Sequence, residues 1–128
     1  MARINVLFFV ESRYKVNRKQ VIASVEHVLQ SQGLQTDVEV SLAIVGDRKM
    51  RSLNQKFRNL DKTTNVLSFP TSEGELIPMP GDVLRLGDVV ISYPQVIQES
   101  AAENYLVDER IEELALHGIN HLLGIHHG

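Results

Sequence analysis

The segment that most restricts the fold lies at the end of the 128-residue chain, where residues 107–123 have the pattern of one long apolar helix. A helix that is apolar around most of its circumference has to lie inside the domain rather than on its surface. We therefore expect a fold built around this helix. Its apolar arc consists of Val107, Ile111, Leu114, Ala115, Ile119, Leu122 and Leu123.

Two histidines in this helix and a third beyond it have the spacing of metal ligands. His117 and His121 are four residues apart, so their imidazoles lie on one helix face, one turn from each other. Gly124 can adopt the left-handed conformation that ends a helix. We expect the helix to stop near Leu123 and the chain to turn back, which would bring His127 to the same ion. Three neutral imidazoles leave a fourth position of a zinc-like ion open, as in catalytic sites.

The three histidines and the glycine match the zinc-protease signature H-E-x-x-H-x-x-G-x-x-H, except at the position of its general base. Gly118 stands where the protease has its catalytic Glu, and a glycine cannot move a proton. The metal must then serve a reaction other than peptide hydrolysis, or another residue must act as the base.

The motif H-G-x-x-H-L-x-G-x-x-H of residues 117–127 resembles that of the YbeY family, bacterial single-strand-specific endoribonucleases involved in ribosomal RNA maturation. Residues 63–70 are similar to the family's T-D-V-L-S-F-P segment, and residues 86–92 to its L-G-D-I-x-I-S strand. Residues 53–58 are similar to its L-N-x-x-(aromatic)-R stretch. The segments occur in the family's order and together span about residues 38 to 127.

Four positions depart from the family's pattern and leave the three histidine ligands intact. Asn65 and His126 stand where the family usually has Asp, Ile125 where it has Tyr, and Asn120 where it has Leu. These departures affect the surroundings of the metal and any proton-transfer group. His126 could shuttle protons, replace His127 as the third ligand or point to solvent.

The resemblance implies a zinc-dependent endoribonuclease that acts on single-stranded ribosomal RNA or the small ribosomal subunit, in rRNA maturation and ribosome quality control. His117, His121 and His127 would hold one Zn²⁺, with nickel, copper or iron as other ions that imidazole suits. Arg58 matches a family position, and its guanidinium would bind the charge that develops on a phosphodiester. Asp88 would either orient a ligating histidine or cap the turn after Gly87.

Two other functions stay open from the sequence. One is a different metallohydrolase, such as a peptidase with an unusual base. The other is a non-enzymatic ribosome-assembly factor in which the metal only stabilises the fold.

Composition is that of a single soluble domain over residues 1–128, with 43% hydrophobic and 23% charged residues. The chain has no cysteine, which excludes disulfides and thiolate metal sites. We see no apolar stretch near the ~20 residues of a membrane helix and no signal-peptide pattern at the start, so the cytoplasm is the expected location. The net charge is −3, but residues 47–62 are mainly basic and residues 99–113 mainly acidic. The basic segment would hold an RNA backbone, or it is an ordinary solvated helix face.

We predict an α+β fold, with a small mixed sheet of about four strands packed with about four helices and the metal-binding helix at its centre. A Gly- and Pro-rich loop over residues 71–85 could serve as a lid. Asp47 is the expected N-cap of the second helix. The predicted strands are 3–10 (buried), 37–45, 65–69 and 86–92, and the predicted helices are 18–32, 47–57, 94–104 and 107–123.

Overall fold

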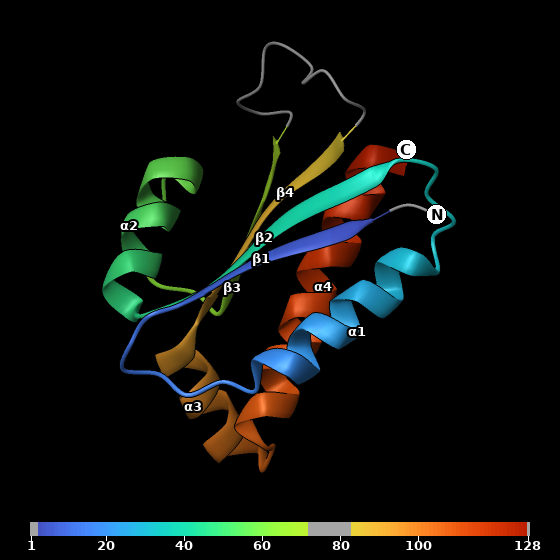
Figure 1. The fold of residues 1–128 in the computed structure, drawn as a ribbon. Helices are drawn as coiled ribbons and strands as arrows, with labels where there is room; N and C mark the ends of the chain where they lie inside the picture. The colour runs from blue at the N-terminus through green and yellow to red at the C-terminus, as the bar shows by residue number, and fades with distance from the viewer. Residues whose placement is uncertain (1–2, 72–82, 128) are drawn as a thin grey trace.

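The protein, described by a computed structural model over residues 3–71 and 83–127, with side chains as far as Gly124, is a four-stranded sheet with four helices (Figure 1). The predicted α+β class is confirmed. Along the chain the elements are β1 (Ile4–Val10), α1 (Arg18–Gln30), β2 (Asp37–Val45), α2 (Asp47–Arg58), β3 (Val66–Pro70), β4 (Val83–Ser92), α3 (Tyr93–Glu103) and α4 (Val107–His127).

The sheet is mixed, with the strand order β1-β2-β4-β3. β2 pairs parallel with both β1 and β4, and β3 pairs antiparallel with β4 at the edge. Along β2 the burial alternates as its sequence predicts, with Val38, Val40, Leu42 and Ile44 buried.

The larger core lies between one face of the sheet and the helices α1 and α4 (Figure 1). α4 packs against β3, β4, α1 and α3, so the helix expected at the centre of the fold is there. Its apolar arc explains this position, because Ile111, Ala115, Ile119 and Leu122 are fully buried.

The other face of the sheet is covered only in part, by α2. Met50 of α2 forms a small buried cluster with Val45 and Val90. The face of β1 beyond α2 stays open, with Leu7 47% and Phe9 59% exposed. The prediction of a buried first strand was therefore wrong, because no described helix covers this side of β1.

Two helix ends differ from the prediction. The N-cap of α2 is Gly46, and Asp47 is already helical; its carboxylate binds side chains outside the helix instead of capping it. α4 does not end near Leu123 but continues through Gly124 to His127. Glycine in a helix costs only about 1 kcal/mol relative to alanine, which the hydrogen bonds of the extra turn can offset.

Most of the predicted loop 71–85 lies outside the described residues, at 72–82. Its last part is regular structure, since β4 begins at Val83.

Candidate active site

Two of the predicted metal ligands lie together on α4. His117 and His121 are exposed and stand one turn apart on the same helix face. Neither imidazole has a hydrogen bond or an ion pair with another residue of the described ranges. Both rings are therefore available to bind one ion, and this pair fits the donor set that zinc prefers.

The third predicted ligand is not brought to this pair by the helix as it stands. At about 1.5 Å per residue, the backbone of His127 lies about 9 Å further along α4 than that of His121. The side chains of Ile125, His126 and His127 lie outside the described part, so the roles predicted for the two histidines remain predictions. Within the described part, no group of three or more His, Cys, Asp or Glu residues is placed to hold a metal.

Gly118, the position without a general base, lies where α4 packs closely against the sheet. A Cβ atom on this residue would lie 2.5 and 2.9 Å from the two Cγ atoms of Val89, and 3.1 Å from Ser68 Oγ. A side chain there would force α4, β4 or the buried Val89 side chain to shift. The sheet itself thus excludes the protease's Glu, and the close contact fixes the histidine turn of α4 against β3 and β4.

Arg58 ends α2 and reaches the edge of the sheet at β3. One terminal nitrogen of its guanidinium donates to the backbone oxygen of Ser68 at 2.9 Å, and the other to the backbone oxygen of Phe57 at 3.3 Å. The guanidinium also lies over the ring of Phe69, 5.3 Å from its centroid. Ser68 therefore contacts Arg58 through its backbone and approaches Gly118 of α4 through its side chain, which brings these sequence-distant predicted residues to one sheet edge.

Asn54 and Thr63, which occur in the family-like segments, have structural roles. Asn54 is buried, and its side-chain amide donates to the backbone oxygen of Lys62 at 2.9 Å. Thr63 donates to the carboxylate of Asp47 at 2.9 Å. These bonds fix the loop after α2 onto the helix and so help to hold Arg58 in place.

The Asp47 carboxylate joins α2, β4 and α3. It accepts hydrogen bonds from Thr63, Ser92 and Gln95, at 2.7 Å from the Ser92 hydroxyl. Partial burial acts to raise the pKa of Asp47, but the three hydrogen bonds outweigh it and bring the pKa below its ordinary value. The ionised form is thus the one that stabilises the fold.

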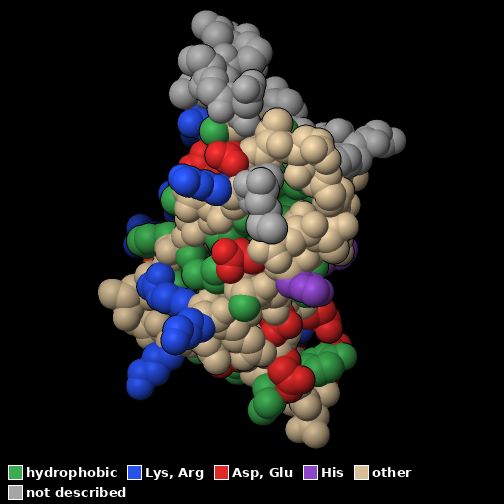
Figure 2. All heavy atoms as spheres, turned by 45° about the vertical axis from the view of Figure 1, so that its right-hand side comes forward, with side chains coloured by type: hydrophobic (Ala, Val, Ile, Leu, Met, Phe, Trp, Pro, Cys, Tyr) green, Lys and Arg blue, Asp and Glu red, His purple; other side chains and the backbone are tan. Residues whose placement is uncertain are grey.

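Basic side chains collect on α2 and the loop after it. Figure 2 shows most Lys and Arg side chains along the left of the face drawn, with Asp and Glu at its centre and lower right and also at its upper left. A hollow of about 840 Å³ lies beside α2, lined among others by Arg48, Arg51, Lys56 and Lys62. Arg51 is engaged by Asp61 in a two-contact ion pair, with distances of 2.8 and 3.1 Å. The charge separation seen in the sequence is thus also a separation in space.

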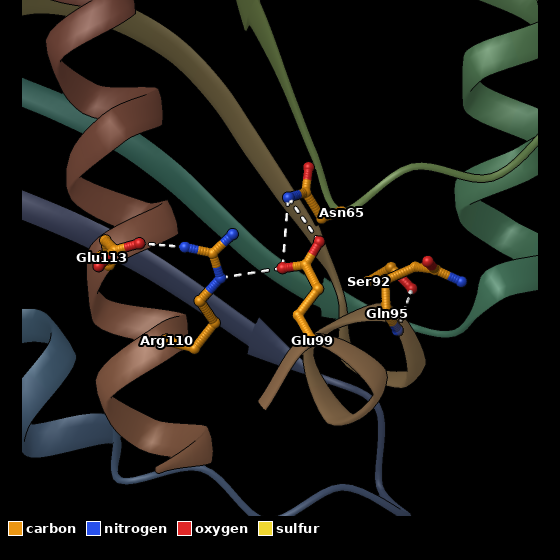
Figure 3. Close-up of polar contacts among 6 residues, drawn as sticks. All are labelled: Asn65, Ser92, Gln95, Glu99, Arg110 and Glu113. Atoms are coloured by element: carbon orange, nitrogen blue, oxygen red, sulfur yellow. Dashed lines mark hydrogen bonds and ion pairs between the residues drawn. The ribbon is translucent and has the colours of Figure 1, made fainter. Parts of the chain in front are cut away.

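Asn65, one of the departures from the family's pattern, belongs to a polar cluster between β3, α3 and α4 (Figure 3). Its amide donates to Glu99 at 3.1 Å, and Glu99 accepts from Arg110 at 2.9 Å. Arg110 also pairs with Glu113. An Asp at position 65 would place a second carboxylate against Glu99, so Asn is the residue that this acidic neighbourhood favours.

Asp88 does not lie where a histidine-orienting residue would. Its neighbour Val89 faces Gly118 on the α4 side, and successive strand residues point to opposite faces. Asp88 instead lines a groove on the other face, together with Phe57 and Phe69. The sequence carried a signal for this, since an acidic residue in an otherwise apolar strand should face away from the core.

The fold and the site define a class of small α+β proteins in which a central helix packs against a mixed sheet and carries an exposed histidine pair. The sequence profile of the family described as Endoribonuclease YbeY matches residues 8–128. The chain belongs to this family. It is 39% identical over 124 residues to "Endoribonuclease YbeY" of Desulforamulus reducens, covering 96% of this chain and 74% of that protein. A relative with the same description from Acinetobacter baumannii is 37% identical over 120 residues, covering 93% and 75%.

A solved structure supports the fold. The solution structure of a Thermotoga maritima protein aligns with a TM-score of 0.57 and 23% sequence identity, over 91% of this chain and 71% of that one. Across the described residues, no helix is both long and apolar enough to cross a membrane.

Proposed function

We propose that the protein is a single-strand-specific endoribonuclease that hydrolyses phosphodiester bonds of ribosomal RNA in the cytoplasm, during rRNA maturation and ribosome quality control. The relatives described as endoribonucleases support the reaction class. The observation that carries the proposal is the contact chain from Arg58 through Ser68 to Gly118, which brings an arginine and the histidine turn of α4 to one edge of the sheet.

The proposal includes one zinc ion held by His117, His121 and His127. When bound, the ion would supply Lewis-acid catalysis and activate a water molecule. His117 and His121 fit this role as they stand, whereas His127 can join them only if α4 ends at Gly124. We therefore expect Gly124→Ala, which favours helix at this point, to raise the melting temperature and to weaken zinc binding in a competition titration with a chromogenic chelator. Unchanged zinc affinity would count against His127 as a ligand.

Arg58 would stabilise the transition state. A guanidinium has five N–H donors, and among the described residues two of them are engaged, by the backbone oxygens of Phe57 and Ser68. The others are available to a phosphate, whose non-bridging oxygens gain negative charge during the reaction. The backbone bonds and the Phe69 ring hold the group in place beforehand, which lowers the cost of ordering it.

The basic side chains on α2 would guide the RNA to this edge. Arg48, Lys56 and Lys62 line one hollow beside the helix, and phosphate contacts of this kind act without regard to sequence. The acidic side chains around Glu99 and Glu113 lie on α3 and α4 and would repel the backbone from that end of the molecule.

The test is cleavage of an end-labelled single-stranded fragment of ribosomal RNA, with the same fragment annealed to its complement as a second substrate. Wild type is compared with His121→Ala and with His27→Ala, a matched change at an exposed histidine of α1. We expect wild type and His27→Ala to cut only the single strand, to stop with chelator and to recover with zinc, while His121→Ala stays inactive.

Two results would overturn the proposal. Equal cleavage by His121→Ala and wild type would show that a contaminating nuclease acts. Absence of cleavage by zinc-loaded wild type would contradict the proposed endoribonuclease activity.

A further inference from the structure

The open face of the sheet, opposite α4, holds a groove whose lining includes none of the proposed catalytic residues. It has a volume of about 620 Å³ and runs between α2 and the strands β2, β4 and β3. Leu53, Phe57 and Phe69 give it an apolar wall, and its polar lining consists of Ser41, Thr71 and Asp88. Phe69 also lies under the guanidinium of Arg58, so the groove borders the proposed active site.

The strand pairing explains the floor of this groove. Ser41 of β2 pairs with Asp88 of β4, and Asp88 pairs with Phe69 of β3. Directly paired residues project from the same face, with Cβ atoms about 5 Å apart. Ser41, Asp88 and Phe69 therefore form one row across the sheet, which places a carboxylate immediately beside an aromatic ring.

The aromatic wall and the cations beside it have the features that bind a flat ring next to a phosphate chain. The rings of Phe57 and Phe69 have centroids 4.8 Å apart at an interplanar angle of 51°, and Phe57 is 46% exposed. The Lys56 ammonium lies 5.2 Å from the Phe57 centroid and the Arg58 guanidinium 5.3 Å from that of Phe69. Aromatic rings next to cations are the usual surface on which proteins stack the bases of single-stranded nucleic acids.

Asp88 decides which base such a surface would prefer. Its side chain is exposed, and it has no hydrogen bond or ion pair with any other residue in the described ranges. An ionised carboxylate only accepts hydrogen bonds. Guanine presents two adjacent donors, N1–H and N2–H, on its Watson–Crick edge, whereas the other three bases place acceptors beside their donors. A carboxylate would bind guanine at two points and repel the others at one or more.

We propose that this groove binds an unstacked guanine of the single-stranded RNA substrate. The base stacks against Phe57 and Phe69, its Watson–Crick edge meets Asp88, and the flanking phosphates lie near Lys56 and Arg58. This inference rests on the proposed ribonuclease function and adds a base preference to it. Because Arg58 borders both sites, the bound guanine would lie close to the bond that is cut.

The test is binding of fluorescein-labelled hexanucleotides, measured by anisotropy with the full chain. The probes are oligouridine and its variants with one central guanosine or adenosine, recovered after each titration to confirm that they are intact. We expect the guanosine probe to bind at least about 5-fold more tightly than the other two, the lower end of the discrimination that a two-point base contact gives.

Variants locate the effect. Asp88→Ala should bring the affinity ratio of the guanosine to the uridine probe close to one, whereas Glu103→Ala, which removes an exposed carboxylate of α3, should keep the ratio. Phe57→Ala should weaken all three probes by about 5-fold or more through lost stacking. Tyr105→Ala, at an aromatic residue that is likewise 46% exposed, should not. Thermal unfolding confirms that each variant is folded.

Equal affinity for the three probes in wild type would overturn the proposal. A guanosine preference that survives Asp88→Ala would overturn it as well. The outcome is separable from that of the cleavage test. Guanosine-selective binding without any cleavage would contradict the proposed ribonuclease activity and support guanine binding in the groove. Zinc-dependent cleavage without a base preference would support the ribonuclease activity and contradict guanine binding.

Discussion

Replacing Gly118 by alanine tests the contact on which the site is built. The added Cβ would lie 2.5 Å from one Cγ of Val89, well inside van der Waals contact, so α4, β4 or the buried Val89 side chain has to shift. Overpacking of this kind costs about 1–3 kcal/mol, and the better helix propensity of alanine returns about 0.5–1 kcal/mol. We expect Gly118→Ala to lower the free energy of unfolding by about 1–2 kcal/mol.

Gly124→Ala is the matched control in the same helix, because a Cβ there would have no neighbour within 4 Å. It should stabilise the protein by about 0.5–1 kcal/mol through helix propensity alone. Urea unfolding followed by circular dichroism compares the two variants, and for a domain of this size each kcal/mol shifts the melting temperature by about 3–5 °C. The two alanines are expected to move the transition in opposite directions.

A double-mutant cycle with Val89→Ala assigns the cost to the contact. Removing the Cγ atoms of Val89 makes room for the new methyl group at Gly118, so the two changes together should be less harmful than their sum, by about 0.5–3 kcal/mol. If Gly118→Ala stabilises the protein as Gly124→Ala does, or if the cycle shows no coupling, then α4 does not pack on β4 through this glycine.

Three further predictions follow from polar contacts. Asn65→Asp places a second carboxylate beside Glu99, so the two like charges repel at neutral pH. The variant should therefore melt at a lower temperature than wild type at pH 7. This difference in melting temperature should shrink at pH 5, where protonation relieves the repulsion. Asp47→Asn should cost about 1 kcal/mol at pH 7. The pKa of Asp47 is lower in the folded state than its ordinary value of about 4. The ionised carboxylate therefore stabilises the fold above about pH 4, and this stabilisation is lost as the pH falls through the lower folded-state pKa. The difference in unfolding free energy between wild type and Asp47→Asn should vanish in strong acid. Arg58→Lys should lower the cleavage rate by about 10-fold or more, because a lysine cannot make a two-point contact. The control is Arg48→Lys, at a residue that lines the hollow beside α2, which should mainly weaken RNA binding. Equal cleavage rates for the two variants would contradict a two-point contact by Arg58.

Local patterns predicted most of the fold. The alternation at 37–45 fits only a half-buried strand, and the apolar arc of residues 107–123 fits only a buried helix. The structure has a strand and a central helix there. The first strand was misjudged because it is apolar on both faces: Leu7 and Phe9 look like core residues although no described element covers them. The end of α4 was misjudged because glycine both permits a helix end and is tolerated within a helix at small cost.

The site was predictable only where it depends on local geometry. The i, i+4 spacing places His117 and His121 on one helix face in any fold. That Arg58 and that helix both reach strand β3 depends on the strand order β1-β2-β4-β3, which the sequence does not encode in any local signal. The same holds for Asp88 and Phe69, which are distant in sequence and become neighbours only through the register of β3 on β4.

The edge strand β3 gives a physical reason for the proposed single-strand specificity. Successive residues of a strand point to opposite faces, so Ser68 meets Gly118 on the α4 side while Phe69 lines the groove on the α2 side. Arg58 contacts both residues from the open edge. An RNA that uses the groove and the histidines of α4 must bend sharply over one strand and turn a base out of its stack. A flexible single strand can do this at small cost, whereas a duplex is stiff and keeps its bases paired.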